Sequence, residues 1–208
     1  MTKRITISTL DAMKASGDKF VMITAYDATF ARLASEAGAE TILVGDSLGM
    51  VLQGHETTIP VSLDAMAYHT ECVARARPHS LIVADLPFMS FSNADDTLHA
   101  STLLMQAGAQ MVKLEGGTWL SDSIHRLVER GVPVCAHLGL TPQSVNVFGG
   151  YHVQGRTPKE AKSILADAVE IQDAGASLLV LECIPAELAA DISSKLDIPV
   201  IGIGAGSG

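Results

Sequence analysis

The stretch "AGAETILVGDS" (residues 37–47) combines the end of a helix with a strand and an acid. Gly38 is typical of a helix C-terminus, the apolar run after it favours a strand, and Asp46 follows where that strand ends. The same plan returns in "AGAQMVKLEGG" (107–117) and "AGASLLVLECI" (174–184), which also place an acid after the strand. A unit that recurs in this way predicts an architecture of repeated helix–strand modules.

Seven short runs rich in Val, Ile and Leu predict strands. They are apolar along their length rather than alternating, which is typical of parallel strands that are covered on both faces. They occupy residues 20–24, 41–44, 80–84, 111–114, 132–136, 177–181 and 198–203. Helical patterns lie between them, with start signals at Ser62, Asn93 and Thr157. Strands that alternate with helices indicate βαβ units and a parallel sheet.

The repeated units favour a (β/α)8 TIM barrel of the α/β class, in which the chemistry is carried at the C-terminal ends of the strands. An open, doubly wound sheet is the alternative. The chain ends at "IGIGAGSG" (201–208), directly after the seventh predicted strand and where an eighth unit is expected. No linker or low-complexity segment divides the 208 residues, so we expect a single barrel-type domain over residues 1–208 that lacks its C-terminal unit.

The bulk composition argues against several classes of protein. A net charge of −9 without a Lys/Arg cluster argues against nucleic-acid binding. No apolar run reaches the roughly 18–20 residues that a membrane span needs, and the N-terminus has no apolar segment of a secretory signal. The cysteines Cys72, Cys135 and Cys183 are odd in number and form no CxxC motif, which indicates reduced thiols and a cytoplasmic protein.

Acids at the predicted strand ends are the candidates for a metal site. Asp46, Asp85 and Glu115 would meet at one mouth of a barrel, where like charges repel unless a cation joins them. Oxygen-rich sites of this kind suit Mg²⁺. Asp27, in "ITAYD", is a further acid at the end of a predicted strand.

Each acid also has a simpler interpretation. Asp46 or Ser47 could cap a following helix, Asp85 could be a turn residue, and Glu115 could be a solvated loop acid. These acids stand at equivalent places on several units, and a barrel brings its strand ends together. It is therefore less plausible that all the simpler interpretations hold at once than that any one of them holds.

Three further side chains at strand ends can each be interpreted in two ways. Lys113 lies two residues before Glu115 and on the same side of the strand; it is either half of a structural ion pair or a clamp for a substrate carboxylate. His137 ends the fifth predicted strand and is either a structural residue or part of the mouth. Glu115 and Glu182 hold equivalent places in the repeat. The nearby lysine favours metal binding by Glu115, and apolar neighbours favour Glu182 as a proton-accepting base.

A set of motifs resembles the ketopantoate hydroxymethyltransferase family over about residues 5–206. In chain order they are "TAYD", "LVGDSLGMVLQGHETT", "ADLPFM", "VKLEGG", "HLGLTPQSVNVFGGY", "VLECIP" and "IGIGAG". The combination of "GDSLGM" with "HLGLTPQSVN" is the most specific part of this resemblance.

The resemblance implies a cytoplasmic barrel enzyme that binds Mg²⁺ and uses 5,10-methylenetetrahydrofolate as co-substrate. It transfers a hydroxymethyl group to 3-methyl-2-oxobutanoate and forms a homo-oligomer, usually a decamer. By resemblance, Asp46, Asp85 and Glu115 match the metal site, and Glu182 matches the base. The residues that match substrate binding are Asp46, Ser47, Asp85, Lys113 and His137.

Two rival functions share parts of this pattern. Another Mg²⁺-dependent barrel enzyme acting on α-keto acids, of the phosphoenolpyruvate/pyruvate lyase or mutase type, would use the same acids without the folate. A non-catalytic barrel that binds a phosphate ligand would use the backbone amides of "GIGAGSG" (202–208).

Overall fold

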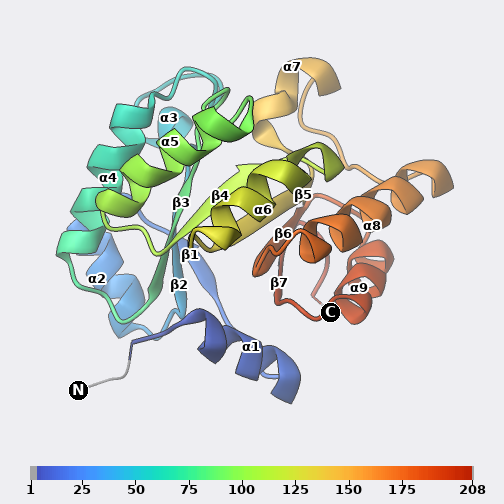
Figure 1. Cartoon of the computed structure of the whole chain (residues 1–208), viewed down its shortest axis with the longest axis horizontal. Coiled ribbons are helices and arrows are strands. Elements are labelled where there is room, and N and C mark those ends of the chain that lie inside the picture. Colours follow the sequence, from blue (N-terminus) through green and yellow to red (C-terminus); the bar gives the residue numbers. More distant parts are fainter. Residues whose placement is uncertain (1–3, 208) are drawn as a thin grey trace. The chain divides into compact units, whose positions relative to one another are not determined.

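The computed structural model describes residues 4–207 (Figure 1). Its strands are hydrogen-bonded to one another in sequence order. They are β1 (Met22–Thr24), β2 (Thr41–Val44), β3 (Leu81–Asp85), β4 (Met111–Glu115), β5 (Val134–Gly139), β6 (Leu178–Glu182) and β7 (Val200–Ile203). Where the register is defined, neighbouring strands are parallel, as the uniformly apolar runs predict.

Helices alternate with these strands. The α-helices are α1 (Ile7–Ser16), α2 (Ala28–Glu36), α3 (Leu48–Val51), α4 (Leu63–Arg75), α5 (Ala94–Gln106), α6 (Ser121–Glu129), α7 (Val145–Phe148), α8 (Pro158–Asp173) and α9 (Ala186–Lys195), and two short 3₁₀ helices are η1 (Thr118–Leu120) and η2 (Pro142–Ser144). The chain divides into two compact units, Met1–Lys113 and Leu114–Gly208. No helix within residues 4–207 is both long and apolar enough to cross a membrane.

The first unit is built on β1, β2 and β3. Ile42 and Ile82 face each other in the register of β2 and β3, and both side chains are fully buried. Helix α4 packs against both α2 and α5, and the three helices run along these strands (Figure 1). The side chain of Ser62 caps α4 by accepting a hydrogen bond from the N–H of Ala65, which the sequence predicts.

The second unit is built on β5, β6 and β7, with α6 and α9 packed against α8 (Figure 1). A capping box between Thr157 and Glu160 starts α8. Gly139 ends β5 with φ 88°, and a Cβ there would lie 2.3 Å from the carbonyl oxygen of Glu182. Only glycine allows this approach, which lets the N–H of Leu140 donate to that carbonyl at 2.8 Å.

The strand predictions are confirmed in number and order, but four strands extend further toward the C-terminus than predicted. β3 includes Asp85, β4 includes Glu115, β5 runs through His137 to Gly139, and β6 includes Glu182. Each polar residue therefore has strand geometry instead of lying in a loop. The starts of α4, α5 and α8 are confirmed, whereas α1, α2, α6 and α9 have no specific prediction.

Asp27 corrects the sequence interpretation in one place. β1 ends at Thr24, and Asp27 is the N-cap of α2. Its Oδ1 atom accepts hydrogen bonds from the N–H groups of Thr29 at 2.7 Å and Phe30 at 2.9 Å. This carboxylate stabilises a helix start and does not join the strand-end acids.

Candidate active site at the strand ends

The first group of site residues lies at the C-terminal ends of β2, β3 and β4. Asp85 faces Lys113 in the strand register, and Lys113 Nζ lies 2.7 Å from Asp85 Oδ1. Both side chains are 4% exposed, so the ion pair is buried. Asp85 Oδ2 accepts a hydrogen bond from the N–H of Asp46 at 3.1 Å, and Asp46 is itself buried. We call Asp46, Ser47, Asp85 and Lys113 the charge cluster.

Ser47 in the charge cluster does not cap a helix. It holds the N-cap position of α3 without a side-chain capping bond, and its Oγ lies 2.8 Å from the hydroxyl of Tyr26. Burial raises the pKa of Tyr26; the hydrogen bond between Tyr26 and Ser47 opposes this rise, and the charges of Asp85 and Asp46 add to it. Both carboxylates therefore act on the same hydroxyl pair.

Gly45 leaves the space that this arrangement needs. A Cβ at residue 45 would lie 2.8 Å from Ser47 Oγ and 3.4 Å from Asp85 Oδ2. The first distance is shorter than a carbon–oxygen contact allows, so a larger residue would push the Ser47 hydroxyl away. The "GDS" motif thus has a packing reason for its glycine as well as a chemical reason for its acid.

The second group of site residues lies at the ends of β4, β5 and β6. His137 Nδ1 lies 3.4 Å from Glu115 Oε1, and His137 Nε2 lies 3.3 Å from Glu182 Oε2. Glu115 Oε2 accepts a hydrogen bond from the backbone N–H of Gln143 at 3.0 Å. The side chains of His137 and Glu115 are almost fully buried, whereas that of Glu182 is 22% exposed. We call Glu115, His137 and Glu182 the proton cluster.

The proton cluster adds contacts to both glutamates that the sequence pattern does not show. Glu182 does not have purely apolar surroundings, because one of its oxygens faces His137. Lys113 pairs with Asp85, and the two oxygens of Glu115 face His137 and Gln143; the expectation that Lys113 favours metal binding by Glu115 stays a prediction. Glu182 is the more exposed carboxylate of the two, with 22% of its side chain exposed against 4% for Glu115.

Cys183 follows Glu182 in a left-handed backbone conformation, with φ 47°. Burial raises the pKa of this thiol, and the charge of Glu182 raises it further. A thiol with a raised pKa stays protonated at neutral pH and is a poor nucleophile. Cys183 is therefore a poor candidate for a catalytic nucleophile.

The structure brings the predicted residues together in two groups. Asp46, Ser47, Asp85 and Lys113 meet in the first unit, and Glu115, His137 and Glu182 meet in the second. Among the described residues, no group of three or more His, Cys, Asp or Glu side chains is arranged to hold a metal ion. The assignment of Asp46, Asp85 and Glu115 to one ion stays a prediction.

Two contacts escaped the sequence reasoning. Tyr26 lies within the quoted motif "TAYD", so the motif could have pointed to it, although nothing in the spacing links it to Ser47. Gln143 contributes a backbone N–H, which no side-chain pattern can reveal.

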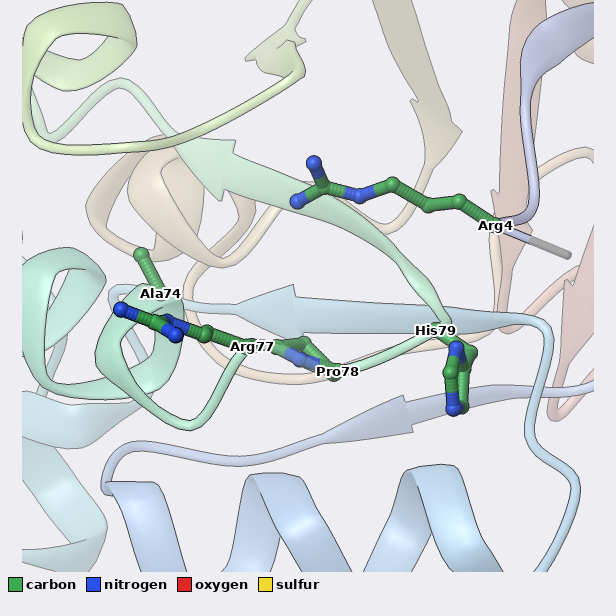
Figure 2. A pocket seen from close by; sticks show the side chains of 5 residues that line it. All are labelled: Arg4, Ala74, Arg77, Pro78 and His79. Carbon is green, nitrogen blue, oxygen red and sulfur yellow. The ribbon is translucent and has the colours of Figure 1, made fainter. Parts of the chain in front are cut away.

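A hollow of about 380 Å³ in the first unit is lined by Arg4, Ala74, Arg77, Pro78 and His79. Its residues 77–79 directly precede β3, so the hollow lies beside the N-terminal end of that strand, away from Asp85 at the C-terminal end. Figure 2 shows the two guanidinium groups and the imidazole ring well apart from one another, without a common point of convergence. We therefore place the candidate site at the strand ends and not in this hollow.

Solved structures show the class of fold. The chain is similar to a putative phosphonomutase from Burkholderia cenocepacia J2315, with a TM-score of 0.72 and 19% identity, covering 95% of this chain and 83% of that one. A putative lyase/mutase from the same organism gives a TM-score of 0.70 and 21% identity, covering 96% of this chain and 73% of that one. These likenesses confirm the predicted (β/α)8 barrel class.

Sequence comparison then gives the family. The model of the ketopantoate hydroxymethyltransferase family matches residues 4–208. A 3-methyl-2-oxobutanoate hydroxymethyltransferase from Pseudomonas fluorescens is 59% identical over 203 residues, which cover 98% of this chain and 76% of the relative. The chain belongs to the ketopantoate hydroxymethyltransferase family, as its motifs predict.

Proposed function

We propose that this chain transfers a hydroxymethyl group from 5,10-methylenetetrahydrofolate to 3-methyl-2-oxobutanoate and so makes ketopantoate for pantothenate biosynthesis. The observation that carries this proposal is the 59% identity, over 98% of the chain, to a relative named for that reaction. The strand-end side chains supply the two functions that the reaction needs, an anchor for a keto acid and an acceptor for its C3 proton.

The donor set of the charge cluster fits Mg²⁺. Asp46 and Asp85 offer carboxylate oxygens at neighbouring strand ends, and Mg²⁺ is usually held by one or two carboxylates while water and substrate oxygens complete its shell. Bound there, the ion would polarise the keto group and favour enolate formation. The additional assignment of Glu115 to this ion rests on its strand-end position and on the family resemblance.

The charge cluster also offers partners for the carboxylate of the keto acid. Lys113 is a buried cation that already holds Asp85 at 2.7 Å, and its ammonium group has three donors to share. Ser47 adds a hydroxyl donor close by, since it lies next to Asp46 and its Oγ contacts Tyr26. A cation and a hydroxyl in a buried place bind an anion strongly, because little water competes for it.

The proton cluster suits removal of the C3 proton. Glu182 is its most exposed carboxylate, so it is the group that accepts this proton from 3-methyl-2-oxobutanoate. His137 Nε2 lies 3.3 Å away and can take the proton onward, and Glu115, 3.4 Å from His137 Nδ1, would stabilise the imidazolium that results. The C3 carbon then bonds to the one-carbon unit of the folate. Water cleaves the bond between that carbon and the folate nitrogen, which gives the hydroxymethyl group and releases tetrahydrofolate.

The test is product formation by the purified chain, with Mg²⁺ and 3-methyl-2-oxobutanoate, in the presence and absence of 5,10-methylenetetrahydrofolate. We expect ketopantoate, detected by mass spectrometry, only when the folate is present. Absence of ketopantoate would contradict the proposal. Turnover of a phosphonate or another α-keto acid without folate would favour the rival lyase or mutase function.

The phosphate-binding alternative has a weaker basis in the structure. Residue 208 of its "GIGAGSG" stretch lies outside the described residues. A Cβ at Gly206 would lie 2.5 Å from the Cβ of Ala186, and one at Gly204 would lie 3.1 Å from Cys183 Sγ. Close packing therefore accounts for these two glycines without a ligand. The homodecamer remains a prediction from the resemblance, and the cytoplasmic location remains a prediction from the cysteines and the resemblance.

A further inference from the structure

We propose that Tyr26 is a positioning residue for the keto acid: it turns the hydroxyl of Ser47 so that this hydroxyl donates to the substrate. The inference rests on the proposed function, because it assumes that Ser47 contacts 3-methyl-2-oxobutanoate. Its own basis is the direct hydroxyl pair, with Tyr26 Oη 2.8 Å from Ser47 Oγ in a partly buried place.

Tyr26 is held from the side by α4. His69 Nδ1 lies 2.9 Å from the carbonyl oxygen of Tyr26, which ties the backbone of residue 26 to that helix. The two rings also meet edge to face, with centroids 6.4 Å apart and an interplanar angle of 76°. These contacts fix the ring, so its hydroxyl is a stationary partner for the Ser47 side chain.

The direction of the hydrogen bond follows from the charges around it. A serine hydroxyl has one proton, which it can give either to Tyr26 or to a substrate oxygen. If Tyr26 donates to Ser47 Oγ, the serine proton is free for the anionic keto acid. If Ser47 donates to Tyr26 instead, a serine lone pair would face the substrate carboxylate and repel it. An anionic substrate therefore selects the arrangement in which Tyr26 donates.

The phenol is suited to this role because it keeps its proton. Burial and the charges of Asp85 and Asp46 raise the pKa of Tyr26, so the hydroxyl is a neutral donor at physiological pH. A phenylalanine at position 26 would keep the packing on His69 and lose only the donor. The Tyr26→Phe variant thus isolates the hydrogen bond.

The experiment is a double-mutant cycle with Tyr26→Phe, Ser47→Ala and the double variant. Calorimetric titration with 3-methyl-2-oxobutanoate in Mg²⁺ measures Kd for each protein. We expect Tyr26→Phe to weaken binding by about 2- to 10-fold, the range for one net hydrogen bond. The double variant should bind no more weakly than Ser47→Ala, because Tyr26 acts only through Ser47.

The matched control is Tyr68→Phe. Tyr68 also packs edge to face on His69, at 5.2 Å, but it is 63% exposed and lies outside both clusters, so we expect wild-type Kd. Thermal unfolding of all variants separates loss of the fold from loss of the contact. A wild-type Kd for Tyr26→Phe would overturn this inference. It would also be overturned if the fold-changes in Kd of the two single variants multiply in the double variant, since the two residues would then act independently. A wild-type protein that binds no keto acid would overturn the proposed function as well.

Discussion

The charge cluster and the proton cluster both lie at strand ends, but their polar side chains are paired in different ways. In the charge cluster an ammonium group lies 2.7 Å from a carboxylate, and both side chains are 4% exposed. In the proton cluster an imidazole lies between two carboxylates, at 3.4 Å and 3.3 Å, and one of these carboxylates is 22% exposed. The first arrangement is tight and closed, and the second is looser and partly open.

This difference indicates a division of roles. In the charge cluster a cation and a carboxylate lie in direct contact in a buried place, which suits the binding of a metal ion and an anionic substrate. In the proton cluster an imidazole lies 3.4 Å from one carboxylate and 3.3 Å from another, a geometry that suits the passage of a proton between them. We therefore expect variants of the charge cluster to lose binding and stability, and variants of the proton cluster to lose proton transfer.

The largest expected effect falls on the proton cluster. Glu182→Gln should slow hydrogen–deuterium exchange at C3 of 3-methyl-2-oxobutanoate by about 10²–10⁴-fold, because that is the contribution of a well-placed base. The exchange is followed by NMR with Mg²⁺ and without folate. Glu187→Gln serves as the control, since Glu187 lies in the first turn of α9 and has no place in either cluster. If Glu182→Gln exchanges at the wild-type rate, Glu182 is not the base, and another group, such as His137, must accept the proton.

The next effect concerns the stability of the charge cluster. Lys113→Met leaves Asp85 as a buried charge without its cation, and we expect the free energy of unfolding to fall by about 3–5 kcal/mol. Urea unfolding measures this change. The combined variant Lys113→Met with Asp85→Asn should recover part of the loss, because it removes the uncompensated charge.

A surface ion pair provides the matched control for Lys113. Lys195 Nζ lies 2.8 Å from Asp191 Oδ2, nearly the same distance, but both side chains are 48% exposed. Lys195→Met should therefore change the free energy of unfolding by only about 0–1 kcal/mol. Equal losses for the two lysine variants would contradict the view that burial sets the importance of the Lys113 pair.

A smaller effect is expected for the glycine beside the charge cluster. Gly45→Ala places a methyl group against Ser47 Oγ and should destabilise the protein by about 1–3 kcal/mol while weakening keto-acid binding. Gly202→Ala is the control, because a Cβ there meets only the Cβ of Ala205 at an ordinary 3.7 Å. Urea unfolding and calorimetric titration of both variants provide the comparison. If Gly45→Ala behaves like Gly202→Ala, the close approach at Gly45 does not control the Ser47 hydroxyl.

The sequence predicts the strands well because each is a local apolar run. It places the ends of β3, β4, β5 and β6 too early, since Asp85, Glu115 and Glu182 look like the start of a loop. Those polar residues continue the strands because neighbouring strands continue beside them, as Asp85 does opposite Lys113. Pairing across strands is not visible in a local pattern.

The same limit applies to the site. The residue types at strand ends indicate acid, lysine and histidine chemistry, but not which group meets which. Lys113 is closer in sequence to Glu115, yet its ion pair is with Asp85 on the neighbouring strand. Tyr26 and Ser47 are 21 residues apart, and their contact depends on how the segments after β1 and β2 fold back. These partners follow from tertiary packing, which the sequence pattern does not specify.

The most direct test of the division of roles is keto-acid affinity, measured for one variant of each cluster side by side. Calorimetric titration with 3-methyl-2-oxobutanoate in Mg²⁺ should give a Kd for Asp85→Asn at least about tenfold weaker than wild type, because a buried charge-assisted contact is lost. Glu182→Gln should bind with nearly the wild-type Kd. Equal weakening in both variants, or a loss confined to Glu182→Gln, would contradict the assignment of binding to the charge cluster and of proton transfer to the proton cluster.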